Sequence, residues 1–315
     1  MLSRRLDGMM SSPKAALTDD GPGKNRPFAP ASALLVLASL LFAVMAVLTK
    51  KVANRLPGPE VAFVRFCIGL IACGVAATRI RLKASNKIGL LLRGAFGGSA
   101  VLLYFLAIEH LQVGVATLLN YTAPVFAAVY AVAFLGELVT PATFGALGLT
   151  TVGVGLVLEG TAPPGSLGLG VWQWVGIGSA LLSGAAVATI REVRKTDGSW
   201  EIFAAFCVGG GLMTALPTAA RWITPNALEW GTLLAIGLLS VSAQLLLTYS
   251  LRFVSAAGAG IIIQLTPVTA LALGWVLFEE RMAGMAIVGA ALTLVGVSWG
   301  AYLASTPQPT PMEEP

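Results

Sequence analysis

Ten apolar runs of about twenty residues each occupy nearly all of this 315-residue chain. An α-helix needs about 20 mainly apolar residues to cross a hydrocarbon core about 30 Å thick, so each run is long enough to span a bilayer. Only 11% of the residues are charged, whereas roughly a quarter are charged in a soluble domain. None of the runs alternates between apolar and polar residues, as the strands of a membrane barrel do. The sequence therefore predicts an all-α integral membrane protein with ten transmembrane helices.

The predicted spans leave little room for a soluble domain. They cover approximately residues 31–50, 60–79, 88–108, 112–136, 141–160, 172–190, 201–220, 229–251, 256–278 and 283–303. Residues 1–30 and 304–315 are polar and rich in Pro and Ser, which predicts disordered tails, and the first tail has no apolar run that could form a signal peptide core. We therefore expect the functional site to lie inside the helical bundle.

One part of the sequence occurs twice, at an offset of 143 residues. The matched positions include Pro124 with Pro267, Val125 with Val268, Glu137 with Glu280, and Leu149–Val154 (LTTVGV) with Leu292–Val297 (LTLVGV). Apolar helices resemble one another in composition, but paired prolines, paired acids and a shared block at one offset are hard to obtain by chance. The sequence therefore predicts a duplicated five-helix unit, with a first repeat over residues 31–160, a linker over 161–171 and a second repeat over 172–303.

The odd number of helices in each repeat sets the relative orientation of the repeats. If the first repeat begins on one side of the membrane, five spans oblige the second to begin on the other side, so the two copies are inverted. Many transporters use inverted repeats to open a shared central site to one side of the membrane at a time. The repeat therefore predicts a carrier that works by alternating access.

The duplicated blocks also resemble a known family. TAPVFAAVYAVAFLGE (residues 122–137) and LTPVTALALGWVLFEE (residues 265–280), each followed by a Gly-rich helix, are similar to those of the drug/metabolite transporter superfamily, in its ten-helix members built from two EamA domains. The resemblance covers about residues 31–303. The overall pattern also resembles bacterial aromatic amino acid exporters of the YddG type. The resemblance implies export of small organic metabolites, with amino acids as the leading class and aromatic ones favoured.

The basic residues predict the orientation in the membrane. Fourteen Lys and Arg residues fall on the side of the amino terminus and six on the other side. Because basic residues accumulate on the cytoplasmic side, both tails are predicted to be cytoplasmic, with the protein in a bacterial inner membrane. The net charge of +5 then reflects topology and gives no reason to expect a nucleic-acid partner.

Pro124 and Pro267 lie inside predicted spans, where proline removes one backbone hydrogen bond and bends the helix. Polar residues come just before both prolines, where backbone carbonyl groups are freed. Each proline is therefore predicted either to act as a flexing point during transport or to form a static kink that only improves packing.

Several charged residues are predicted to lie toward the ends of spans. Glu137 and Glu280 follow their prolines by about 20 Å of helix, so we expect them at the membrane surface, either capping the amide groups of a neighbouring helix or acting as gates. Lys50 and Arg65 are outer-mouth candidates, which either meet a substrate carboxylate or anchor their helices at the interface. Arg65 is expected to snorkel to the surface or to pair with Glu60.

Six polar side chains within the spans are candidates for a central substrate cavity. They are three tyrosines suited to stacking on a planar substrate and three amides suited to orienting its polar groups: Tyr104, Tyr121, Tyr249, Asn120, Gln244 and Gln264. Which of them face the cavity depends on helix rotation, which the sequence leaves open. No Asp or Glu falls in the middle third of a predicted span, which favours exchange or downhill transport over proton pumping.

Other functions have little support in the sequence. The lone histidine and the absence of HExxH, GxSxG and Walker-type motifs argue against an enzyme or a nucleotide-driven pump, and no loop resembles the selectivity filter of a channel. Three cysteines at unrelated spacings indicate packing rather than a metal site or disulfides, and no cofactor is expected. A monomer is favoured, with a dimer left open.

Two further substrate classes differ in the charge that they require. Lipophilic cations or drugs are carried by other members of the superfamily and are the main alternative to amino acids. Phosphorylated sugars require a basic cavity, which the sequence does not predict because few cations fall deep within the spans.

Overall fold

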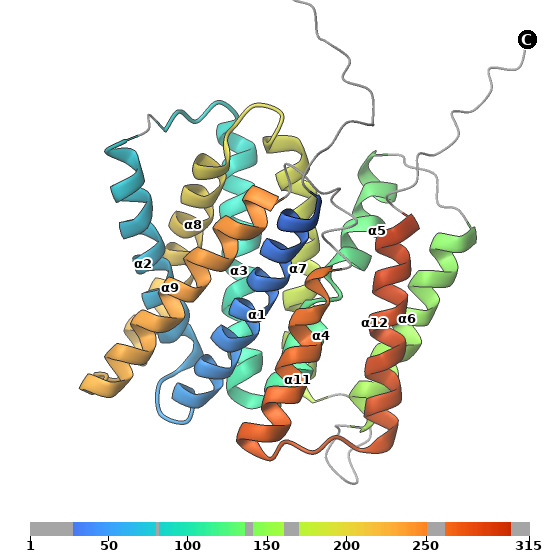
Figure 1. Ribbon diagram of the computed structural model, residues 1–315. Helices are drawn as coiled ribbons and strands as arrows, with labels where there is room; N and C mark the ends of the chain where they lie inside the picture. Colours follow the sequence, from blue (N-terminus) through green and yellow to red (C-terminus); the bar gives the residue numbers. More distant parts are fainter. Residues whose placement is uncertain (1–27, 80–81, 136–140, 161–169, 251–261, 304–315) are drawn as a thin grey trace, which may run out of the picture.

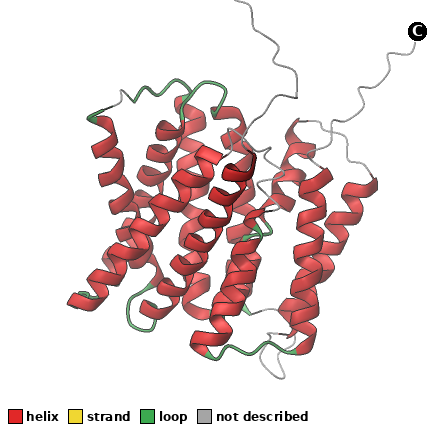
Figure 2. Ribbon diagram, in the orientation of Figure 1, coloured by secondary structure: helices red, strands yellow, loops and turns green. Residues whose placement is uncertain are grey.

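The computed structural model describes residues 28–79, 82–135, 141–160, 170–250 and 262–303 (Figure 1). These residues form helices and loops and contain no strand (Figure 2), so the all-α prediction is confirmed. Most of the predicted tails and linker lies outside the described residues, and residues 28–30 of the first predicted tail belong to the first helix. The helices are α1 (Phe28–Val52), α2 (Gly58–Ala77), α3 (Lys87–His110), α4 (Val113–Asn120), α5 (Ala123–Leu135), α6 (Pro141–Gly160), α7 (Val171–Val193), α8 (Ser199–Ala220), α9 (Ala227–Ser250), α11 (Leu265–Phe278) and α12 (Gly284–Leu303).

The lengths and directions of these helices fit a membrane-spanning bundle. Six of them, namely α1, α2, α3, α7, α8 and α9, are long and apolar enough to cross a membrane, and the others contain shorter apolar stretches. The Phe28 end of α1 and the Leu303 end of α12 lie on the same side of the bundle (Figure 1), as an even number of spans requires. We term this side the amino-terminal side.

α6 and α12, the last helices of the two repeats, cross each other at paired glycines. A Cβ added at Gly153 would lie 2.5 Å from the backbone nitrogen of Thr293, and one added at Gly296 would lie 2.7 Å from that of Thr150. Both distances are too short for a side chain, so only glycine lets the two backbones approach this closely. Gly153 and Thr150 match Gly296 and Thr293 at the offset of 143 residues, so the two contacts are equivalent.

The same pair of equivalent contacts occurs where α2 crosses α8. A Cβ added at Gly69 would lie 2.6 Å from the sulfur of Cys207, and one added at Gly210 would strike the ring of Phe66. Phe66 and Gly69 match Cys207 and Gly210 at an offset of 141 residues. α2 and α6 therefore pack antiparallel against their own copies, α8 and α12. This arrangement places a pseudo-two-fold axis through the crossing, at right angles to the helices.

The direction of this axis shows that the repeats are inverted. A two-fold axis at right angles to membrane-spanning helices lies in the membrane plane and turns one repeat upside down onto the other. The other contacts follow the same symmetry, in which α7, α9 and α11 are the copies of α1, α3 and α5. α1 packs on α9 as α7 packs on α3, and α1 packs on α11 as α7 packs on α5. The predicted inversion is therefore confirmed, and residues beside the axis lie near the middle of the bilayer.

The span predicted over residues 112–136 is interrupted rather than bent. α4 ends at Asn120, a turn occupies residues 121–122, and α5 begins at Ala123. Pro124 thus stands in the first turn of a new helix, where the N–H that it lacks has no intrahelical partner to lose. The proline starts a helix here instead of kinking one.

A matching break occurs in the second repeat. α11 begins at Leu265, and Pro267 stands in its first turn. The side-chain nitrogen of Gln264 donates a hydrogen bond to the carbonyl oxygen of Tyr121 at 3.4 Å, and these two residues match at the offset of 143. Residues that match and also touch must lie beside the axis. The two helix breaks therefore meet near the middle of the membrane.

Carboxylates join helix ends of one repeat to loops of the other. Asp197, between α7 and α8, accepts hydrogen bonds from the backbone amides of Ser85 at 2.7 Å and Asn86 at 3.0 Å. On the opposite side, Glu60 of α2 accepts one from the backbone amide of Ile223 at 3.0 Å. The repeats are thus held together at both surfaces as well as in the middle.

Replacing Gly153 or Gly296 with Ala should lower the melting temperature of the purified protein in detergent, because the added methyl group forces α6 and α12 apart. Overpacking of this kind costs about 1–3 kcal/mol. Gly155→Ala is the matched control on α6, since no atom lies within 4 Å of the Cβ that it adds. Equal melting temperatures for the three variants would contradict the proposed role of the crossing.

The contacts of Asp197 predict that stability depends on pH. Hydrogen bonds from the Thr196 hydroxyl and the Ser85 amide hold the pKa of the Asp197 carboxyl below its usual value. The carboxylate therefore stabilises the fold above its unfolded pKa, about 3.9, and this stabilisation is lost as the pH falls through the lower folded pKa. Asp197→Ala should lower the melting temperature at neutral pH, and its gap to the wild type should close in acid.

Glu192→Gln is the control for this measurement. Glu192 forms a surface ion pair with Lys195, and both side chains are more than 60% exposed, so little stability depends on it. We expect its melting temperature to follow that of the wild type at every pH. If the gap between Asp197→Ala and the wild type persisted in acid, the stabilisation would have a source other than the carboxylate.

Candidate functional site

A cavity of about 120 Å³ lies inside the bundle, between helices of both repeats. It is lined by Phe42, Met45, Arg65, Val101, Tyr104, Phe105, Asn120, Tyr121, Phe206 and Gln244. Because Tyr121 lies beside the pseudo-two-fold axis, the cavity reaches the middle of the membrane, the depth at which transporters with inverted repeats bind their substrates. Its wall is aromatic and apolar apart from one cation and a few neutral polar groups.

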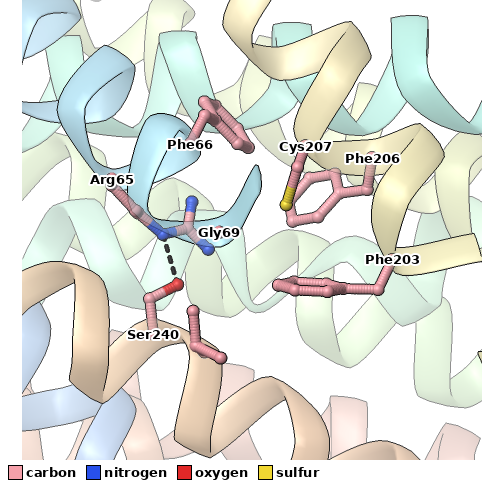
Figure 3. A pocket seen from close by; sticks show the side chains of 8 residues that line it. Arg65, Phe66, Gly69, Phe203, Phe206, Cys207 and Ser240 are labelled. Carbon is pink, nitrogen blue, oxygen red and sulfur yellow. Dashed lines mark hydrogen bonds between the residues drawn. The ribbon is translucent and has the colours of Figure 1, made fainter. Parts of the chain in front are cut away.

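Arg65 of α2 supplies the one charge in this wall, and only 6% of its surface is exposed. Its Nε donates a hydrogen bond to Ser240 Oγ at 2.5 Å (Figure 3). The guanidinium also lies between 5.2 and 5.7 Å from the ring centres of Phe66, Phe105 and Phe206. Its Nη1 has no hydrogen-bond partner, and no carboxylate of the described residues pairs with it. No acid of the described part of the chain therefore neutralises this charge.

Arg65 lies deeper than the sequence predicted. It directly precedes Phe66, which lies at the α2–α8 crossing, so it is about one helical turn or less from the membrane midplane. The expected pairing with Glu60 is wrong, because Glu60 bonds to the Ile223 amide instead. A cation at this depth is costly and has no route to the surface, so it is no interfacial anchor.

Four of the six predicted cavity residues line the cavity, namely Tyr104, Asn120, Tyr121 and Gln244. The hydroxyl of Tyr104 is hydrogen-bonded to that of Thr117 at 2.9 Å, and the side-chain nitrogen of Asn120 donates to Ser179 Oγ at 2.9 Å. These bonds fix two of the polar groups at the wall. That any of the four contacts a substrate stays a prediction.

The other two candidates lie elsewhere. Gln264 is buried and bonds to the Tyr121 carbonyl, so it joins the two interrupted spans. Tyr249 lies near the end of α9 with 49% of its surface exposed, so the expectation that it lies deep in the bundle is wrong. Helix rotation decided both outcomes, and the sequence carried no signal for it.

Lys50 and Glu280 hold the turn between α3 and α4, on the side opposite the chain ends. Lys50 Nζ donates hydrogen bonds to the carbonyl oxygens of Ile108 at 3.0 Å and Leu111 at 2.7 Å, which the end of α3 leaves free. The Glu280 carboxylate accepts the backbone amide of Val113 at 3.0 Å, at the start of α4. The capping role expected for Glu280 is therefore confirmed, and Lys50 caps a helix end rather than standing free at an open mouth.

Burial also affects Glu280, which lies in the loop between α11 and α12. Desolvation raises the pKa of its carboxyl above the usual value, and the hydrogen bond from the Val113 amide opposes this rise. Glu137, its match in the first repeat, lies outside the described residues.

Arg93 of α3 is a second buried cation, which the prediction of orientation counted among the basic residues of the amino-terminal side. Only 6% of its surface is exposed, and its guanidinium lies 4.2 Å from the ring centre of Phe206. The available signal was the run GAFGGS (Gly94–Ser99) that follows it, because closely spaced glycines let a neighbouring helix approach and cover what precedes them. With Arg65 and Arg93 both deep in the bundle, the argument against a basic site is wrong.

The described residues hold no group of three His, Cys, Asp or Glu side chains placed to bind a metal ion. Cys73 and Cys207 belong to an apolar cluster with Phe66, Phe203 and Phe206, and Cys207 packs against Gly69 (Figure 3). The cysteines are free thiols. Two of them thus serve packing, as expected.

Known proteins share this architecture. The sequence profile of the EamA-like transporter family matches residues 29–159 and 170–300, once in each repeat. The chain is 29% identical to the pseudopaline exporter CntI of Pseudomonas aeruginosa, over 83% of this chain and 92% of that protein. It is 28% identical to a riboflavin transporter of Rhizobium johnstonii, over 82% and 87%. It is 24% identical to the human solute carrier family 35 member G1, over 93% and 85%.

A solved crystal structure also matches, with a TM-score of 0.59 and 20% sequence identity, over 87% of this chain and 97% of that one. At this identity the likeness shows the fold alone. The family profile covers most of the chain in two copies, as the structural repeat requires. The chain therefore belongs to the EamA-like transporter family, a family of ten-helix membrane transporters rather than enzymes.

Proposed function

We propose that this transporter exports small metabolites that carry a carboxylate, with aromatic amino acids as the leading substrates. The observation that carries the proposal is Arg65, a cation without a carboxylate partner among the described residues, in the aromatic wall of a cavity near the membrane midplane. A substrate carboxylate neutralises this charge through charge-assisted hydrogen bonds. The rings of Phe42, Tyr104 and Phe105 then pack against a planar side chain.

The direction of transport and the compartment are part of this proposal. The pseudopaline exporter among the relatives supports export. The excess of basic residues on the amino-terminal side supports a bacterial inner membrane with both tails in the cytoplasm. The amino-terminal side is then cytoplasmic, and the turn that Lys50 and Glu280 cap lies on the outer side. The transporting unit is a monomer with repeats over residues 31–160 and 172–303.

The main alternative substrate is a lipophilic cation. Arg65 disfavours it, because a positive charge in a cavity wall of low dielectric constant repels a cation and has no acid beside it to compensate. The aromatic rings that would otherwise bind a cation already face the guanidinium. A carboxylate fits both the charge and the rings.

The cavity has to enlarge before it can hold such a substrate. Its volume of about 120 Å³ is below the roughly 300–1,000 Å³ of ligand pockets. The breaks before Pro124 and Pro267 are the places where the spans already lack continuous helical hydrogen bonds. We assign these two positions as the flexing points that open the cavity, in turn, to each side.

Inside-out membrane vesicles should accumulate labelled phenylalanine in a saturable way when the protein is present, and unlabelled tyrosine should compete. Arg65→Gln should raise KM for phenylalanine, because losing a hydrogen bond to a charged group costs about 1.5–3 kcal/mol. This cost corresponds to a roughly tenfold to hundredfold loss of affinity. Arg65→Lys keeps the charge and should retain part of the affinity. Arg221→Gln, which removes an exposed cation at the end of α8, is the matched control.

Two outcomes would reject the proposed substrate or the proposed mechanism. Efflux of tetraphenylphosphonium without any amino acid flux would assign the protein to lipophilic cations. Flux that rises linearly with concentration and shows no counterflow would indicate a channel, since a carrier saturates.

Pro124→Ala and Pro267→Ala should slow transport several-fold while the amount of protein in the membrane changes little. Alanine removes the ring that clashes with the preceding turn and lets the helix continue through the break, which stiffens the flexing point. Pro217→Ala is the control, because Pro217 lies inside α8 away from either break. Wild-type turnover in both break variants, at equal abundance, would reject the flexing-point role.

A further inference from the structure

Arg93 is a deeply buried cation for which the proposed carboxylate site has no use. Its Nε is enclosed without a hydrogen-bond partner, and no acid of the described residues pairs with it. Among the described residues, its guanidinium contacts the face of the Phe206 ring, at 4.2 Å from the ring centre. A cation with so few partners inside a membrane is costly, and such residues commonly mark the path of a substrate.

Phe206 connects this second cation to the cavity. Its ring lines the cavity and lies 5.7 Å from the Arg65 guanidinium, so both arginines face one aromatic ring. Phe206 also packs tightly on α3, because a Cβ added at Gly97 would lie 2.9 Å from it. Phe206 is therefore a contact that Arg93 shares with the cavity wall.

The two arginines are attached to the backbone on opposite sides of the membrane midplane. α2 starts on the outer side (Figure 1), and Arg65 comes just before the α2–α8 crossing, so its backbone lies slightly outward of the midplane. α3 starts on the cytoplasmic side, and Arg93 comes before Gly94 and Gly98, which meet α8 at its crossing region. The backbone of Arg93 thus lies inward of the midplane, and its side chain runs along α3 toward the midplane, because a Cβ added at Gly97 would strike its Nη1.

Packing alone does not require an arginine at either position. At the offsets of the repeat, Arg93 matches Ile236 and Arg65 matches Phe206. Ile236 is fully buried and Phe206 is 4% exposed, so apolar side chains satisfy the same scaffold positions in the second repeat. The charge at residue 93 therefore needs a reason other than the fold.

We infer that Arg93 is a second carboxylate-binding subsite, on the cytoplasmic approach to the cavity, and that Phe206 is the partition that the carboxylate passes to reach Arg65. This inference rests on the proposed export of carboxylates. Two weak sites close together suit transport, since a substrate bound at one charge leaves toward the other instead of remaining trapped. The first cation draws the anion out of the cytoplasm, and the second receives it at the cavity.

The test is the charge selectivity of chemical labelling at residue 93. Cys67, Cys73 and Cys207 are replaced with Ser, Arg93→Cys is added, and inside-out vesicles are treated with an anionic (sulfonatoethyl) or a cationic (trimethylammonioethyl) methanethiosulfonate. Residue 93 should react from the cytoplasmic side. The anionic reagent should be favoured several-fold over the cationic one, after correction for their rates with a free thiol, because Arg65 still attracts anions.

Two variants complete the experiment. Adding Arg65→Gln should abolish the preference for the anionic reagent at residue 93. Leu91→Cys is the matched control on α3, because Leu91 is 72% exposed on the surface of the bundle, where lipid excludes both charged reagents, and it should not react. If Arg93→Cys fails to reach the membrane, Phe206→Cys with both arginines kept is tested by the same criteria.

Absence of reaction at residue 93, or reaction without an anionic preference, would overturn the inference. Labelling needs no substrate, so it is independent of which metabolite is carried. A preserved preference without phenylalanine flux would reject aromatic amino acids and support the anion path. Phenylalanine flux without the preference would reject the second subsite and leave the proposed function standing.

Discussion

The close contact between the two repeats is the constraint on which the rest of the structure depends. In lipid, helices gain little from the hydrophobic effect when they associate, so they rely on small residues that let backbones meet. Glycines provide this where α2 crosses α8 and where α6 crosses α12. Because each helix meets its own copy, these contacts fix a two-fold axis in the membrane plane. The helix breaks and Arg65 lie beside that axis, so the contacts that hold the bundle also set the depth of the cavity.

The scaffold is symmetric, but the chemistry of the cavity is not. Arg65 matches Phe206, and Ser240, which binds Arg65, matches Gly97, against which Phe206 packs. Arg65 and Ser240 thus form a cation–hydroxyl pair, whereas at the equivalent positions the ring of Phe206 packs on Gly97. Both deep cations come from the first repeat, and the second repeat supplies the ring that they face. The two repeats therefore share a scaffold but differ at matched positions around Arg65.

The sequence predicted the architecture because hydrophobic runs and a repeat offset are properties of the chain itself. It predicted the role of Glu280 for a similar reason, since an acid at a helix end has few partners other than free amides. Depth and rotation depend on packing and were not predictable. Arg65 was expected near the surface because it comes early in its apolar run, and its distance from the start of the run does not show where the helices cross. Tyr104 and Tyr249 looked alike in the sequence, yet one lines the cavity and the other is exposed.

The unpaired charge also bears on how transport is driven. Under the proposed function, the empty carrier changes conformation with an uncompensated guanidinium in a medium of low dielectric constant, which is costly. A bound carboxylate cancels that charge, so the loaded carrier moves more readily than the empty one. No Asp or Glu in the middle third of a span is placed to take the carboxylate's role, so a protonated acid cannot stand in for the substrate on the return step. The charge of Arg65 therefore favours exchange of one carboxylate for another over the return of an empty site.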